Sequence, residues 1–216
     1  MANTQLWSKV DGYITDNLLG HDPVLEEALK ASDAAGLPQI AVSAPLGAML
    51  HLLALGSSRI LEVGTLGGYS TICLARALGD GGKLITLEYD PKHAEVAEAN
   101  IARAGLADKV DIRVGAALDT LATMEGEEPF DLFFIDADKV NNPNYYAWAL
   151  KHSKPGTKII VDNVIRGGAI VDPSDTSEAV VGTRALFEAV GPQVKATAIQ
   201  TVGSKSYDGF LLAIVQ

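Results

Sequence analysis

The chain has very little cysteine and no long apolar runs. Cys73 is the only cysteine in 216 residues, so no internal disulfide can form. No uncharged apolar run approaches the 18 residues expected of a membrane-spanning helix. The N-terminus, MANTQLWSKVDGYI, lacks the basic-then-apolar order of a secretory signal. We therefore expect a soluble, cytoplasmic protein with no membrane partner.

Basic residues are also scarce. The sequence has 17 Lys and Arg against 27 Asp and Glu, which gives a formal net charge of −10 at pH 7. Such a surface repels nucleic-acid phosphates and anionic lipid headgroups, so we expect no nucleic-acid partner. With 48% hydrophobic residues and no internal repeat, low-complexity tract or linker, the chain is suited to one packed domain over residues 1–216.

The hydrophobic periodicity changes near residue 59. Helical patterns cover roughly residues 3–19, 23–35 and 43–55, and they predict an N-terminal helical segment over about residues 1–57. Five β-rich runs then alternate with helical patterns: RILEVG, KLITLEY, VDIRVG, FDLFFID and TKIIVDN. This alternation is typical of a parallel sheet with helices on both faces.

The end of the sequence departs from that alternation. VKATAIQTV and YDGFLLAIV are separated only by a GSKS turn region, so these two strands must be antiparallel. We therefore predict an α/β fold with a Rossmann-like, seven-stranded, mostly parallel sheet that ends in an antiparallel hairpin.

Polar residues and glycines follow the predicted parallel strands. Ligands of open α/β sheets bind outside the carboxyl ends of the strands. The residues at these ends are Glu62 with Gly64, then Glu88, Gly115, Asp136, and Asp162 with Asn163. Any one of them is also a common turn or cap residue. Five such strand ends together indicate a ligand site at one edge of the sheet.

The stretch LEVGTLGGYST joins the first strand to a predicted helix. Its glycines allow a sharp turn and a close approach of backbone to a ligand. Glu88 closes the next strand, where a carboxylate can bind both hydroxyls of a ribose. The glycine spacing is G-x-x-G-G rather than G-x-G-x-x-G, which weakens the alternative of a nicotinamide-dependent oxidoreductase.

Several segments together resemble a known family. LEVGTLGGYSTICLA, LITLEYDPKHAEVAEANI, FDLFFIDADK, KIIVDNVIRGG and VGSKSYDGFLLAIV are similar to the cation-dependent class I O-methyltransferases of the caffeoyl-CoA and catechol type, and most to their small bacterial members. The matches fall in order over roughly residues 38–216. The resemblance implies S-adenosyl-L-methionine as the methyl donor and a homodimer, with the N-terminal segment contributing to the substrate mouth or the dimer contact.

The resemblance also implies roles for individual residues. The residues assigned to the cofactor are Val42, Glu62, Gly64, Ser70, Glu88, Ala117 and Asp136. Glu62, Gly64 and Ser70 would hold the methionine part and shape the loop, and Glu88 would bind the ribose. Ala117 would lie against the adenine in a pocket that Val42 also lines. Ordinary core packing is the alternative for Val42 and Ala117.

Asp136, Asp162 and Asn163 form the predicted metal site. They offer only oxygen ligands, which suit Mg²⁺ or Ca²⁺ rather than Zn²⁺. Mg²⁺ is the first choice, with Ca²⁺ or Mn²⁺ as alternatives. Three protein oxygens leave coordination positions for water or for two vicinal oxygens of a substrate. Together with this open site, the resemblance implies a small aromatic acceptor with two vicinal hydroxyls, such as a catechol, phenylpropanoid or flavonoid.

Lys139 is the predicted catalytic base beside Asp136. On position alone a solvated loop lysine is the alternative, but the resemblance makes the lysine of FFIDADK the proton acceptor. Asp138 has three open interpretations: peripheral metal binding, capping of the next turn, or no chemical role. Tyr145, Tyr146 and Trp148 are equally open, as substrate walls or core. A nonenzymatic S-adenosylmethionine-binding protein remains a further alternative to the enzyme.

Overall fold

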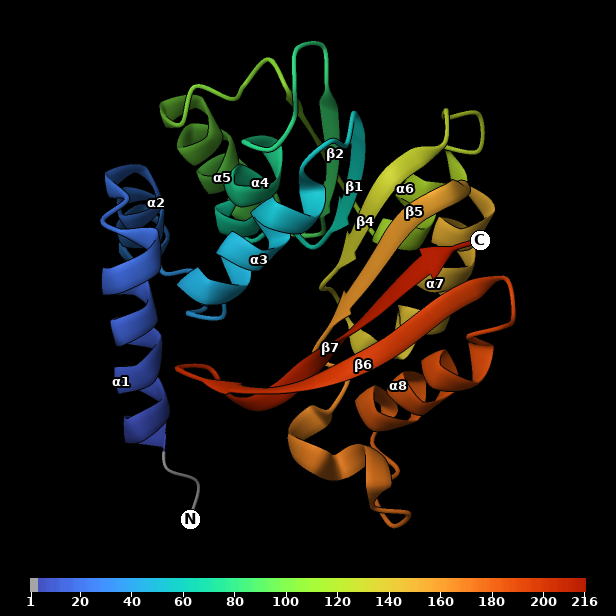
Figure 1. Cartoon of the computed structure of the whole chain (residues 1–216). Coiled ribbons are helices and arrows are strands. Elements are labelled where there is room, and N and C mark those ends of the chain that lie inside the picture. Colours follow the sequence, from blue (N-terminus) through green and yellow to red (C-terminus); the bar gives the residue numbers. More distant parts are fainter. Residues whose placement is uncertain (1–3) are drawn as a thin grey trace.

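The computed structural model describes residues 4–216 (Figure 1). The N-terminal elements are α1 (Thr4–Ile14), the π-helical turn η1 (Thr15–Leu19), α2 (Pro23–Ala34) and α3 (Ala44–Ala54). The alternating part comprises β1 (Arg59–Val63), α4 (Tyr69–Ala75), β2 (Lys83–Glu88), α5 (Pro91–Arg103), β3 (Val110–Val114), α6 (Ala117–Ala122), β4 (Phe130–Ile135), the 3₁₀ turn η2 (Lys139–Asn141), α7 (Asn142–Lys151) and β5 (Ser153–Asp162). The 3₁₀ segment η3 (Arg166–Val171), α8 (Glu178–Ala189), β6 (Val194–Gly203) and β7 (Ser206–Val215) complete the fold.

The three predicted N-terminal helices are present, although residue 3 of the first lies outside the described residues. Local capping chemistry explains where α2 begins. The side chain of Asp22 accepts hydrogen bonds from the amides of Val24 and Leu25, and Pro23 occupies the first turn, where no amide is needed. The sequence pattern and its caps therefore determine this segment locally.

The seven strands within residues 4–216 form one sheet with the order β3-β2-β1-β4-β5-β7-β6. The strands β1 to β5 are mutually parallel, whereas β7 is antiparallel to both β5 and β6. The predicted fold class, a mostly parallel sheet with a C-terminal antiparallel hairpin, is confirmed.

Two apolar cores lie on the two faces of the sheet. One includes Leu50 of α3 and Ile72 of α4, and the other includes Tyr145 of α7 and Leu186 of α8. Figure 1 shows α3, α4 and α5 on one side of the sheet and α6, α7 and α8 on the other. Burial on both faces explains why β1, β4 and the end of β5 are rich in apolar residues.

The strand register places the predicted site residues at one edge. Val63 at the end of β1 pairs with Ile135 of β4, and Ile135 pairs with Val161 of β5. Asp162 is opposite Phe210 of β7. The residues that directly follow β1, β4 and β5 therefore lie next to one another at this edge of the sheet. Among the helices of residues 4–216, none combines the length and the apolar character needed to cross a membrane.

Candidate active site

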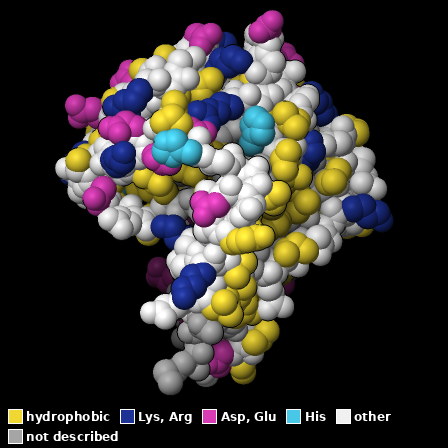
Figure 2. Space-filling view, turned by 60° about the vertical axis from the view of Figure 1, so that its left-hand side comes forward, with side chains coloured by type: hydrophobic (Ala, Val, Ile, Leu, Met, Phe, Trp, Pro, Cys, Tyr) yellow, Lys and Arg dark blue, Asp and Glu magenta, His cyan; other side chains and the backbone are white. Residues whose placement is uncertain are grey.

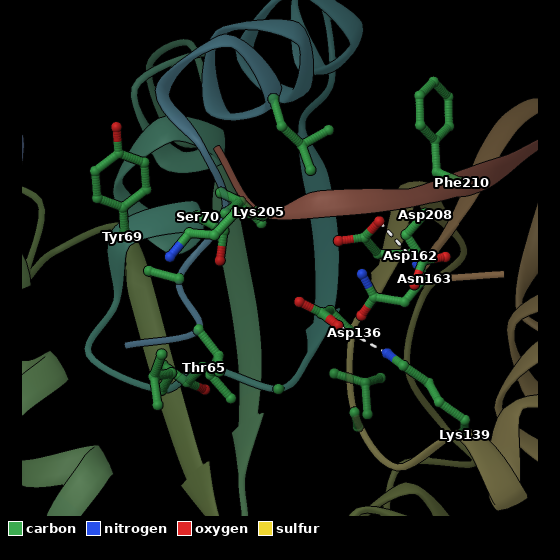
Figure 3. A pocket seen from close by; sticks show the side chains of 18 of the residues that line it. Thr65, Tyr69, Ser70, Asp136, Lys139, Asp162, Asn163, Lys205, Asp208 and Phe210 are labelled. Carbon is green, nitrogen blue, oxygen red and sulfur yellow. Dashed lines mark hydrogen bonds and ion pairs between the residues drawn. The ribbon is translucent and has the colours of Figure 1, made fainter. Parts of the chain in front are cut away.

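A cavity of about 1440 Å³ opens at the carboxyl ends of the parallel strands. Its lining includes nine of the residues singled out in the sequence: Val42, Gly64, Ser70, Glu88, Ala117, Asp136, Lys139, Asp162 and Asn163. Glu62 does not line it. Figure 3 shows Thr65 of the loop after β1, with Tyr69 and Ser70 at the start of α4, on one side of the pocket and the group around Asp136 on the other.

The glycines of the first loop allow close packing of backbone. Gly64 has a φ of 100°, and a Cβ there would collide with the main-chain oxygen of Asp136. Gly68 has a φ of 83°, and its Cβ would lie 3.4 Å from Ala97 of α5. Only glycine combines this conformation with such close neighbours. These glycines therefore allow the loop to lie against the end of β4 and the start of α4 to pack on α5.

Glu88 fastens this loop to the end of β2. Its Oε2 accepts hydrogen bonds from the amides of Thr65 (3.1 Å) and Leu66 (2.8 Å), and its Oε1 accepts one from Asp90 (2.9 Å). The residue lines the cavity but is only 7% exposed. Glu88 therefore has a structural role that the sequence did not reveal, while its contact with a ribose stays a prediction.

Glu62 lies behind the cavity wall with no exposed surface. Its carboxylate accepts hydrogen bonds from the hydroxyls of Ser70 (2.6 Å), Thr71 (2.5 Å) and Thr86 (2.7 Å). Burial raises the pKa of Glu62 to about 7, although the three hydroxyls oppose that shift. Of the two roles predicted for Glu62, these contacts fit the shaping of the loop. Its contact with the cofactor stays a prediction.

Asp136, Asp162 and Asn163 converge on the other side of the cavity (Figure 3). Asp162 is 6% exposed, and burial together with the charge of Asp136 raises its pKa well above the ordinary value of an aspartate. The side chain of Asn163 has no hydrogen-bond partner within residues 4–216. The same part of the chain contains no group of three His, Cys, Asp or Glu side chains arranged for a metal. The candidate donor set is two carboxylates and one amide.

Lys139 is directed at this group rather than at solvent. Its Nζ donates to Oδ1 of Asp136 at 2.8 Å, and its side chain is 10% exposed. Helix α8 packs closely against it, because a Cβ on Gly182 would collide with the main-chain oxygen of Lys139. The alternative of a solvated loop lysine is therefore wrong.

Asp138 precedes the turn that carries Lys139, but its side chain accepts no hydrogen bond from the amides of that turn. It accepts hydrogen bonds from Asn141 Nδ2 (2.6 Å) and from the hydroxyl of Tyr145 (2.5 Å). These side-chain contacts are not a cap of the turn, and its other two interpretations stay predictions. Tyr145 also lines the cavity, whereas Tyr146 and Trp148 do not and belong to the core. Of these three aromatics only Tyr145 lines the cavity, and its hydroxyl donates to Asp138.

Some cavity residues carried no recognisable signal in the sequence. Asp11 of α1 accepts a hydrogen bond from the amide of Ser204 (2.7 Å), and Lys205 donates to the main-chain oxygen of Gln39 (2.9 Å). Asp208 of β7 lies near Asp162 (Figure 3). The first two contacts join residues 193 and 166 positions apart. Local patterns carry no information about such pairs.

The comparisons with known proteins agree with this geometry. Residues 17–209 match a family described as O-methyltransferase. The chain is 56% identical over 211 residues to a catechol O-methyltransferase of Mycobacterium tuberculosis, covering 96% of this chain and 95% of the relative. It is 50% identical to a catechol O-methyltransferase of Niastella koreensis, covering 99% and 100%. It also resembles the crystal structure of the O-methyltransferase from Bacillus cereus in complex with SAH, with a TM-score of 0.96, 52% identity and coverage of 99% and 100%.

Proposed function

The chain belongs to the O-methyltransferase family, and from this premise we propose that it transfers a methyl group from S-adenosylmethionine to one hydroxyl of a vicinal dihydroxy aromatic, with a divalent cation. The observation that carries the proposal is the convergence of Asp136, Lys139, Asp162 and Asn163 in a cavity shared with the glycine loop. The two relatives named catechol O-methyltransferase support a catechol-like, phenylpropanoid or flavonoid acceptor.

The loop side of the cavity is the proposed site for S-adenosylmethionine. Gly64 and Ser70 would meet its methionine part, Glu88 its ribose, and Ala117 and Val42 its adenine. All five residues line the same cavity. The Bacillus cereus relative, solved with SAH and 52% identical, supports S-adenosylmethionine as the cofactor. Glu62 would act from behind by holding Ser70 in place.

The other side is the proposed site for Mg²⁺, with Ca²⁺ or Mn²⁺ as alternatives. Hard oxygen ligands suit these cations. A cation between Asp136 and Asp162 would relieve the repulsion that helps to raise the pKa of Asp162. When bound, the cation would be chelated by the two substrate hydroxyls and would ease the deprotonation of one of them.

Lys139 is the proposed proton acceptor. When unprotonated, its Nζ would take the proton of the acceptor hydroxyl, the resulting oxygen would form a bond to the methyl carbon, and the carbon–sulfur bond would break to release S-adenosylhomocysteine. Opposite charges cancel during this transfer, so positioning and exclusion of water contribute more than covalent catalysis. The position of Lys139 in the cavity, with its Nζ 2.8 Å from Oδ1 of Asp136, supports that role.

A methyl-transfer screen tests the proposed function. Catechol, caffeate, caffeoyl-CoA and a dihydroxylated flavonoid are each incubated with S-adenosylmethionine and Mg²⁺, and the products are identified by mass spectrometry. We expect monomethylated products from the free catechols. Thermal stabilisation by NADH but not by S-adenosylhomocysteine would instead indicate an oxidoreductase. Stabilisation by S-adenosylhomocysteine without turnover of any acceptor would indicate a nonenzymatic binding protein.

We also propose a homodimer that uses the N-terminal helices. Val10 and Tyr13 of α1 are 47% and 71% exposed, and Leu18 of the following turn is 79% exposed. Figure 2 shows hydrophobic side chains gathered in a strip over the narrow part of the molecule that ends at the N-terminal helix. Exposed apolar surface of this kind is typical of a protein contact.

A further inference from the structure

The turn that follows β5 has an unusual backbone. Asn163 and Arg166 have φ values of 57° and 55°, in the left-handed region that non-glycine residues rarely adopt, and Gly167 and Gly168 continue in that region. Such conformations cost free energy and persist where surrounding contacts impose them. Because this turn begins with Asn163, directly after Asp162 at the end of β5, whatever holds the turn also sets the position of Asn163 relative to Asp162.

Contacts from β7 hold the turn. Oδ1 of Asp208 accepts hydrogen bonds from the amides of Ile165 and Arg166, both at 2.9 Å. Its Oδ2 lies 3.8 Å from Nη1 of Arg166. The main-chain oxygen of Gly209 accepts a further hydrogen bond from the amide of Val164 at 2.9 Å. Three consecutive amides of the turn are thus bound to two consecutive residues of β7.

We propose that Asp208 is a positioning residue for the cation site: by binding the amides of Ile165 and Arg166 it fixes the turn that presents Asn163 beside Asp162. The inference rests on the proposed cation site for its functional consequence. The effect is attributed to the hydrogen bonds that Oδ1 of Asp208 accepts, because two amides bind this atom. Partners that orient metal ligands in this way typically contribute about 10- to 100-fold to metal affinity.

Two substitutions separate hydrogen bonding from charge. Asp208→Ala removes the acceptor, whereas Asp208→Asn retains a carbonyl oxygen that can accept both amides but loses the charge. Asp131→Ala is the matched control, because Asp131 accepts two consecutive amides, of Ser58 (2.7 Å) and Arg59 (2.9 Å), next to the amino end of β1. The probe is Mn²⁺ alone, titrated by electron paramagnetic resonance without substrate or cofactor.

We expect Asp208→Ala to weaken Mn²⁺ binding about 10- to 100-fold, Asp208→Asn to restore most of the affinity, and Asp131→Ala to leave it unchanged. Wild-type affinity in Asp208→Ala would overturn the inference. So would equal weakening in Asp208→Asn, because the charge would then be the cause.

Amide hydrogen exchange in cation-free protein provides a readout that does not depend on the metal. We expect faster exchange at Ile165 and Arg166 in Asp208→Ala and nearly normal exchange in Asp208→Asn. Unchanged exchange in Asp208→Ala would contradict the positioning role. If the wild-type protein bound no Mn²⁺, the proposed cation site would fail, and the exchange rates alone would decide whether Asp208 holds the turn.

Discussion

Lys139 offers a test of proton transfer at the level of a single side chain. Replacing it with Ala should lower the rate at neutral pH by about 10²- to 10⁴-fold, the usual contribution of a general base. The rate should partly recover as pH rises, because more of the catechol then ionises without assistance. A pH profile of the rate constant for methyl transfer measures both effects.

Lys139→Arg is the control for charge. Arginine keeps a cation beside Asp136 but stays protonated at every pH of the profile, so it cannot act as a base. We expect it to be as slow as Lys139→Ala at neutral pH, with Mn²⁺ affinity retained in both. A Lys139→Ala profile that matches the wild type at every pH would show that this lysine takes no proton.

Glu62 makes a prediction about stability. Its pKa is raised to about 7 from 4.5, chiefly by burial, so between these values the folded state keeps a proton that the unfolded state releases. Stability from this group is therefore lost as pH rises through that interval, by about 3 kcal/mol at most. Urea unfolding at several pH values should show a smaller decline for Glu62→Gln, and equal declines would contradict the assigned shift.

The sequence predicts where along the strands the candidate site residues lie, but it does not predict how deeply each side chain is buried or whether it reaches the cavity. Strand periodicity placed Glu62, Asp136 and Asp162 at strand ends, and the sheet register brought those ends together. Which of them reach the cavity depends on packing by distant elements. The burial of Lys139 is an example, because it depends on Gly182 of α8.

At the level of elements, the β6–β7 hairpin reaches α1 across the mouth of the cavity. Asp11 accepts the amide of Ser204 in the hairpin turn, and both Asp11 and Val202 line the cavity. Asp11→Ala should raise the KM for the aromatic acceptor about fivefold, the equivalent of about 1 kcal/mol for one hydrogen bond, and leave cofactor affinity unchanged.

Steady-state kinetics and calorimetry check this prediction. The control is Asp16→Ala, which removes an exposed carboxylate of η1 that does not line the cavity. Equal KM values for wild type and Asp11→Ala would show that the hairpin contact does not shape the acceptor site.

Most elements were predictable because their signals are local. Asp22 with Pro23 marked the start of α2, and the short turn before Ser206 required an antiparallel hairpin. The hairpin's contact with α1 was not predictable, since it joins residues that share no local pattern. The cavity mouth depends on such contacts, which explains why the sequence predicts a class of acceptor but not how the acceptor fits.

At the level of the whole molecule, the exposed apolar side chains of the N-terminal helices predict self-association. Light scattering should give a mass near twice the 22.7 kDa of one chain. Replacing Tyr13 and Leu18 with Asp should shift the mass toward that of one chain, because burial of charge at an apolar contact is unfavourable. A wild-type mass near 22.7 kDa at micromolar concentration would contradict the proposed dimer.

The dependence of turnover on a divalent cation tests the central claim most directly. Methyl transfer from S-adenosylmethionine to a catechol is measured before and after EDTA treatment, in the wild type and in Asp162→Ala, with cofactor binding followed by calorimetry. We predict that EDTA abolishes turnover, that Mg²⁺ restores it in the wild type but not in Asp162→Ala, and that both proteins still bind the cofactor, since the glycine loop and Glu88 lie on other strands. Full activity of the EDTA-treated wild type would contradict the account.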